Sequence, residues 1–200
     1  MKTFSEYLQT NSNEGLVLEA FENLVGNDKD TIKKKNAYKK EILDLLRKSY
    51  ESIGGIKGSG FQNEKDMVKN IWFWKLWKQD GHPAAVIMYK DRAGRKMVAL
   101  GTDGSEKAKA AIKKMMFDEI SLSRSYGEAS GPALGMVRKI FGLGKNAPFE
   151  GSPLEKYMVP AEMVGDILKK PVKPVSKYEY IRAIGGDDEK KVMFGVKYKR

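Results

Sequence analysis

The stretch WFWKLWKQDGHPAAVIMYKDRAGRKMVAL, residues 72–100, decides the fold. Apolar and aromatic side chains alternate over its first part, which is typical of a β-strand. One face would carry Trp72, Trp74, Leu76 and Lys78, and the other Phe73, Lys75 and Trp77. Asp80 and Gly81 predict a tight hairpin turn into a second strand over 84–89. A turn over 91–94 leads to a third strand over 96–100, so three consecutive antiparallel strands are expected.

Downstream of this stretch the pattern alternates between helix and strand. Alanine and lysine favour a helix directly after the third strand, and Pro132 suits the first turn of a later one. Pro171 and Pro174 mark the end of a short helix. The elements expected here are a helix over 105–118, a strand over 125–129, a helix over 130–141, a short helix beginning at 159–162, and a hairpin of 178–184 with 190–198.

Upstream, residues 30–52 predict a basic amphipathic helix, because apolar residues recur at spacings of three, four and seven among lysines. Asn63 is a candidate cap of a second short helix that runs to residue 70. The first 25 residues contain an apolar stripe of only about two helical turns, too short to be stable alone in water. We therefore expect a detachable segment over 1–25 and one α/β (α+β) domain over 26–200.

Composition narrows the classes of function. The 200 residues contain no cysteine and one histidine, His82, in a predicted turn, so thiolate catalysis is excluded and no metal site is expected. No apolar run approaches the length of a membrane-spanning helix, so no membrane partner is expected. The formal net charge of +11 divides into −4 over residues 1–30 and +15 over the remainder. Such a surplus favours nucleic acid or another anionic partner, although a lysine-rich soluble surface has the same composition.

The order of expected elements from residue 30 onward resembles the acyl-CoA-dependent N-acetyltransferase (GNAT) family. The resemblance implies a mixed, mainly antiparallel sheet flanked by helices, and acetyl-CoA as cofactor. In that family the turn after the fourth strand presents backbone amides to the cofactor pyrophosphate, as a helix N-terminus is suited to do. The residues matching this turn, with a following lysine, are Gly101, Thr102, Asp103, Gly104, Ser105 and Lys107.

The same stretch also fits a simple glycine turn in which Ser105 caps the next helix. Asp103 stands where the family has no acid, and a pyrophosphate would repel it unless its side chain pointed away. A splayed pair of fourth and fifth strands beside residues 101–105 would expose a cofactor slot, and a filled gap would exclude one. The resemblance further implies catalytic or orienting roles for Glu128 and Tyr126 on the next strand. A structural ion pair and a core tyrosine are the alternatives.

The aromatic cluster at 72–77 suggests a second kind of site. Bases could stack on exposed rings while Lys75 and Lys78 neutralise phosphates. The same residues would equally serve as the core of an early strand.

The N-terminus resembles the capsid-targeting segment of internal head proteins of T4-type tailed phages, on the evidence of residues 1–8 followed by 15–20. In that family the segment directs packaging into the prohead and is clipped after a Leu/Ile-X-Glu pattern. The nearest matches here end at Glu19 and Glu22. The resemblance implies phage head or prohead partners and a place in the virion interior or the host cytoplasm.

Three hypotheses of function follow. The chain is a packaged phage N-acetyltransferase acting on a host protein or other amine, or a catalytically inactive basic head protein that binds DNA, or an inhibitor of a host protein. Whether it is an enzyme is left open by its residues, because fold alone does not settle activity.

Overall fold

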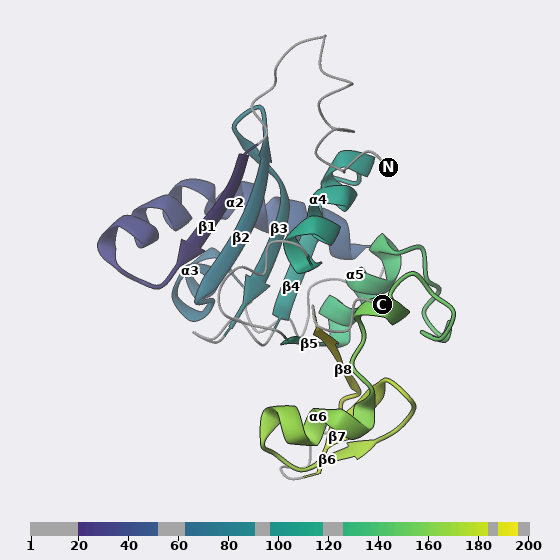
Figure 1. The fold of residues 1–200 in the computed structure, drawn as a ribbon. Coiled ribbons are helices and arrows are strands. Elements are labelled where there is room, and N and C mark those ends of the chain that lie inside the picture. Colours follow the sequence, from purple (N-terminus) through teal and green to yellow (C-terminus); the bar gives the residue numbers. More distant parts are fainter. Residues whose placement is uncertain (1–19, 52–62, 91–96, 118–125, 184–187, 196–200) are drawn as a thin grey trace, which may run out of the picture.

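The structure, a computed structural model, describes residues 20–51, 63–90, 97–117, 126–183 and 188–195 (Figure 1). The predicted turn over 91–94 and residues 1–19 therefore lie outside the described residues. The described elements are β1 (Ala20–Val25), α2 (Lys29–Glu51), α3 (Glu64–Asn70), β2 (Phe73–Gln79), β3 (His82–Tyr89), β4 (Met97–Thr102), α4 (Glu106–Phe117), β5 (Tyr126–Ser130), α5 (Gly131–Ile140), a 3-10 turn (Glu155–Tyr157), α6 (Ala161–Leu168), β6 (Val172–Pro174), β7 (Glu179–Arg182) and β8 (Lys191–Gly195).

The α+β class is confirmed, and the GNAT-like arrangement of the strands stays a prediction. The strands form two four-stranded sheets, ordered β1-β2-β3-β4 and β5-β8-β7-β6. Each pairing between described strands is antiparallel. β4 and β5 are the facing edge strands of the two sheets and contact each other across a seam.

Local signals in the sequence explain the turns and caps that frame these elements. Asp80 and Gly81 both have positive φ angles, of 53° and 84°, as the predicted hairpin turn requires. Asn63 caps α3, because its side-chain oxygen accepts a hydrogen bond from the Asp66 amide at 2.9 Å. Both features confirm the sequence prediction.

Helices cover both faces of the first sheet, as Figure 1 shows. The alternation along β2 sends Trp74 toward α2, where Lys35 Nζ lies 5.5 Å from the centre of its ring. The other face carries Lys75, whose ammonium donates to the carbonyl of Met115 on α4 at 3.0 Å. Trp74 and Trp77 are buried, so this strand lies in the middle of the core.

A small second core lies under the second sheet. It is formed by Val159, Ala161, Val164, Tyr180 and Met193. Figure 1 shows α6, β6 and β7 together at one end of the molecule, with β8 leading back to the main body. The end that contains α6, β6 and β7 is thus joined to the main body through β8 and its partner β5.

The boundary expected at residue 25 requires a correction. Residues 20–25 form β1, which pairs with β2 from Ala20 opposite Lys78 to Val25 opposite Phe73. Leu24 is buried in the main core. The folded domain therefore includes residues 20–25, because the apolar residues of this segment complete the edge of the first sheet.

Candidate functional site

The glycine bend at 101–105 was the expected cofactor site, and its amides are bonded within the chain. The Asp103 amide donates to the Ala84 carbonyl at 3.0 Å, extending the β3-β4 ladder. The Gly104 amide donates to Thr102 Oγ1 at 2.8 Å, and the Ser105 amide to Asp103 Oδ1 at 2.9 Å. Asp103 thus turns its carboxylate onto the bend and occupies the position an external anion would need.

Ser105 is the N-cap residue of α4, since its hydroxyl oxygen accepts a hydrogen bond from the Ala108 amide at 3.1 Å. Lys107, in the first turn of α4, is exposed. The bend is therefore a well-formed strand-to-helix turn, the alternative that the sequence left open.

The edge of β4 beside this bend is covered by the C-terminal turn of α2. The amides of Leu100 and Thr102 donate to Tyr50 Oη at 3.1 Å and to Ser49 Oγ at 3.0 Å. Ser49 Oγ in turn lies 2.8 Å from the Thr102 carbonyl oxygen. Burial raises the pKa of Tyr50, which keeps its hydroxyl protonated.

Gly101 has a packing reason of its own. A Cβ atom at this position would lie 3.0 Å from Leu46 Cδ2 and 3.1 Å from Ser49 Oγ. Glycine thus eases the close approach of α2 to β4, because a side chain at this position would force Leu46 or Ser49 to shift. A phosphorylated cofactor does not fit at this bend. The backbone amides of the bend, and those of Leu100 and Thr102 on the outer edge of β4, already donate hydrogen bonds within the chain.

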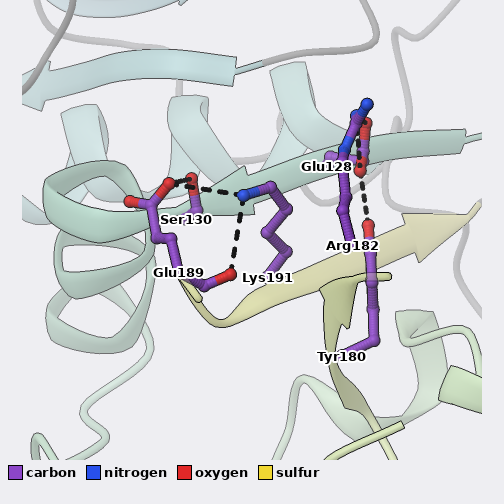
Figure 2. Close-up of polar contacts among 6 residues, drawn as sticks. All are labelled: Glu128, Ser130, Tyr180, Arg182, Glu189 and Lys191. Atoms are coloured by element: carbon purple, nitrogen blue, oxygen red, sulfur yellow. Dashed lines mark hydrogen bonds and ion pairs between the residues drawn. The ribbon is translucent and has the colours of Figure 1, made fainter. Parts of the chain in front are cut away.

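Glu128 lies at the seam between the two sheets, in the group of polar residues drawn in Figure 2. Its carboxylate accepts a hydrogen bond from Tyr180 Oη at 2.6 Å and pairs with Arg182 Nη2 at 3.1 Å. Burial, reinforced by the charge on Glu128, raises the pKa of Tyr180. Glu128 is itself 7% exposed. A buried carboxylate with an arginine and a tyrosine as partners suits a structural ion pair.

Tyr126 lies two residues before Glu128 on β5, and it packs against the small second core. The structure therefore places both residues on one strand, as expected, and gives Tyr126 a packing role. Tyr180 and Arg182, the partners of Glu128, were not identified from the sequence. Their i, i+2 spacing within the predicted C-terminal hairpin was the available signal, because it puts them on one face of the strand.

The same seam holds a second polar group, also drawn in Figure 2. Ser130 Oγ donates to Glu189 Oε2 at 3.1 Å, and Lys191 Nζ lies 3.4 Å from the same oxygen. A cavity of about 10 Å³ separates the two polar groups, lined by Met97, Glu128, Ser130, Arg182 and Lys191. This volume is at the lower limit for a single water molecule. Arg182 Nε is buried there without a hydrogen-bond partner in the structure.

The two lysines expected to contact phosphates point into the molecule. Lys75 is 3% exposed and is held by the Met115 carbonyl, so a phosphate would reach it only if α4 moved. Lys78 Nζ lies 2.9 Å from Glu22 Oε2 and 3.2 Å from Tyr38 Oη. The hydrogen bond from Lys78 to Glu22 raises the pKa of the lysine.

His82 is exposed, and its Nδ1 lies 2.9 Å from Glu41 Oε2. Within the described ranges, no three histidine or acidic side chains come together as a metal site. None of the helices described is both long enough and apolar enough to cross a membrane.

The structure is that of an α+β protein with two antiparallel sheets and a cluster of polar side chains on the second sheet, beside the seam. No protein-family model matches the chain, and neither a curated protein nor a solved structure does.

Proposed function

We propose that this chain is a basic, nucleic-acid-binding protein with a GNAT-like fold. In this fold, α2 covers the edge of β4 at the position where the cofactor of that family would bind. The order of helices and strands, with β4 and β5 facing each other across a seam, supports the GNAT-like fold. The main observation against catalysis is that the backbone amides along the outer edge of β4 already have hydrogen-bond partners. Its Leu100 and Thr102 amides are bound by Tyr50 and Ser49.

The catalytic candidates support the same choice. A general base has to be able to take a proton from the substrate in reach of solvent or ligand. The carboxylate of Glu128 is buried and already engaged by Tyr180 and Arg182. The side chains of Asp103 and Ser105 likewise accept hydrogen bonds within the bend and from the first turn of α4.

The outer face of α2 supplies the cations for a phosphate-binding surface. Lys29, Lys33 and Lys40 are exposed, and among the residues the structure describes no carboxylate lies within ion-pair distance of them. Their spacing along a helix with a rise of about 1.5 Å per residue spreads them over roughly 16 Å on one side. A row of cations of this kind binds polyanions through phosphate neutralisation, without base recognition.

Calorimetry with acetyl-CoA tests whether the cofactor can bind at this position. We expect no heat of binding from the unmodified chain, because the amides that would hold the pyrophosphate are occupied. Saturable binding that is abolished by Gly104→Glu would overturn the proposal and restore the acetyltransferase hypothesis.

Salt-dependent retention on duplex DNA tests the α2 surface. The triple variant Lys29→Gln, Lys33→Gln, Lys40→Gln should weaken binding and flatten the dependence of log K on log salt by about 0.9 for each phosphate that is no longer neutralised. The matched control removes three exposed lysines elsewhere, with Lys145→Gln, Lys173→Gln and Lys190→Gln. Equal weakening in the two variants would refute a specific role for α2.

We further propose that the protein is packaged in a phage head and then begins at Ala20. A cut after Glu19 would leave β1 whole, whereas a cut after Glu22 would divide β1 and remove the partner of Lys78. Mass spectrometry of the virion form should therefore find Ala20 at the new terminus. An intact Met1 or a terminus at Asn23 would contradict this expectation.

A further inference from the structure

The outer edge of β6 lies at the end of the molecule that α6, β6 and β7 form (Figure 1), and β6 is the last strand of its sheet among the strands described. On its inner side, the Pro171 carbonyl accepts a hydrogen bond from the Ala183 amide at 3.2 Å. Farther along, the Val175 amide donates to the Glu179 carbonyl at 2.8 Å. Val172 is at an alternate position of this ladder, so its amide and carbonyl point away from β7. A strand edge with such groups is suited to pair with another strand.

A hollow of about 600 Å³, wide open to solvent, is lined by residues of this edge and of α6. Its apolar lining on the side of β6 comes from Pro171, Val172 and Pro174. A strand added to β6 would therefore bury apolar surface in the hollow as well as forming backbone hydrogen bonds.

The charged lining of the hollow is balanced, although the chain as a whole has a net charge of +11. Glu162 and Asp166 lie one turn apart on the same face of α6, and Lys169 and Lys170 follow at its C-terminal end. All four side chains are exposed. Within the described part of the chain, none of them forms an ion pair. The hollow thus presents two carboxylates and two ammoniums to whatever covers it.

This balance favours a second copy of the chain as the occupant. An acidic partner would meet the two carboxylates, and a basic partner would meet the two ammoniums. In a two-fold symmetric interface, by contrast, the same patch faces itself in reverse. Glu162 and Lys169 lie about 10 Å apart along the direction of α6, so this reversal can set the acids of one copy against the lysines of the other. We propose that the chain forms a two-fold symmetric dimer through the outer edge of β6 and the hollow beside it.

The alternation along β6 also selects the centre of the pairing. With the two-fold axis at Val172, the Val172 amide of each copy donates to the Val172 carbonyl of the other, which gives two hydrogen bonds. An axis at Lys173 would place two like charges directly opposite each other. The axis therefore lies at Val172. This interface is separate from the α2 surface, and its test needs no nucleic acid.

Sedimentation velocity of the full chain from about 1 to 300 μM tests the dimer. A salt concentration of about 150 mM screens the long-range repulsion between two basic chains. We expect a shift from monomer to dimer as the concentration rises, and slower hydrogen exchange of the Val172 amide in the dimer. A chain that stays monomeric over this range would overturn the proposal.

Two charge-reversed variants test how the copies face each other. Glu162→Lys with Asp166→Lys makes the charged lining wholly basic, and Lys169→Glu with Lys170→Glu makes it wholly acidic. Each variant alone should raise the dissociation constant of the dimer about tenfold or more, because like charges then face each other. An equimolar mixture of the two variants should form a heterodimer, because a basic hollow then meets an acidic one.

The matched control is Glu150→Lys with Asp188→Lys, which raises the net charge as much as the first variant does, at exposed positions outside the hollow. This control should dimerise like the unmodified chain. Circular dichroism spectra of all variants should coincide, since the replaced side chains are exposed. Equal weakening in the control, dimers that persist in both reversed variants, or a mixture that stays monomeric would each overturn the proposal.

Discussion

At the scale of single residues, Glu155 anchors the segment that follows α5. Its Oε1 accepts hydrogen bonds from Tyr178 Oη at 2.7 Å and Lys177 Nζ at 3.1 Å, and its Oε2 accepts one from the Gly151 amide at 2.8 Å. These contacts, led by the one from Tyr178, lower the pKa of Glu155 to about 2. One carboxylate thus ties a loop, a 3-10 turn and the approach to β7 together.

We expect the Glu155 carboxylate to make the free energy of unfolding depend on pH in the acidic range. Its pKa is about 2 in the folded chain and near 4.5 when unperturbed, so its contribution is complete above about 4.5 and is lost as the pH falls toward 2. Glu155→Gln should flatten the pH dependence of the free energy of unfolding in this window. Urea unfolding between pH 2 and 6 measures the effect, with Glu150→Gln as the control. A wild-type slope that survives in Glu155→Gln would show that other groups cause it.

Two lysines show why residue roles could not all be predicted from the sequence. Lys35 belongs to a helix whose lysines suggested a solvated face, yet its ammonium is buried and donates to the carbonyls of Gly26 and Ile71 at 2.8 and 2.9 Å. Lys75 is buried in the same way against Met115. Periodicity places a side chain on a face, but only the neighbouring chain segments decide whether its charged end finds internal acceptors.

At the scale of elements, the approach of α2 to β4 is the closest helix-strand contact described above. It depends on Gly101, where an added Cβ would meet Leu46 and Ser49. Because α2 also binds the edge amides of β4 through Ser49 and Tyr50, a shift of the helix would break those hydrogen bonds as well.

Gly101→Ala should therefore lower the free energy of unfolding by about 1–3 kcal/mol, the usual cost of overpacking a filled core. Gly144→Ala is the matched control, since its Cβ would meet only Ala147 Cβ at 4.0 Å. Chemical denaturation of both variants measures the difference. If Gly101→Ala proved as stable as the control, the helix would have room to move and the cofactor place would not be firmly closed.

Most elements were predictable because their signals are local. The helix over 30–52 became α2, the helix over 105–118 became α4, and the C-terminal hairpin became β7 and β8. The edge strands β1 and β6 were missed. β6 has only three residues, and β1 lies in the stretch that was expected to be a detachable segment, so neither was predicted as a strand.

The candidate site was predictable only in part. Glu128 was singled out, but its partners Tyr180 and Arg182 come from a strand more than fifty positions away. The closed bend at Asp103 also depends on a distant element, since Ser49 and Tyr50 of α2 bind the adjoining strand. The hydrogen-bond partners at both sites come from elements distant in sequence, and the local sequence pattern does not predict such contacts.

At the scale of the whole molecule, β8 couples the two cores. Val192 and Phe194 pack in the main core, whereas Met193 between them packs in the small one. Met193→Ala should lower global stability by about 2–5 kcal/mol while unfolding remains a single transition. Met163→Ala, at an exposed position of α6, should change little. Far-ultraviolet circular dichroism and tryptophan fluorescence should give coincident curves, and separate midpoints would show that the cores unfold independently.

The alternation along β8 makes this strand intolerant of any change in length. One residue inserted before Val192 would reverse the side on which each later residue projects. Methionine would then face the large core and the valine and phenylalanine the small one, so both interiors would be misfilled at once. Among homologous chains, we expect substitutions in this strand but no insertions or deletions.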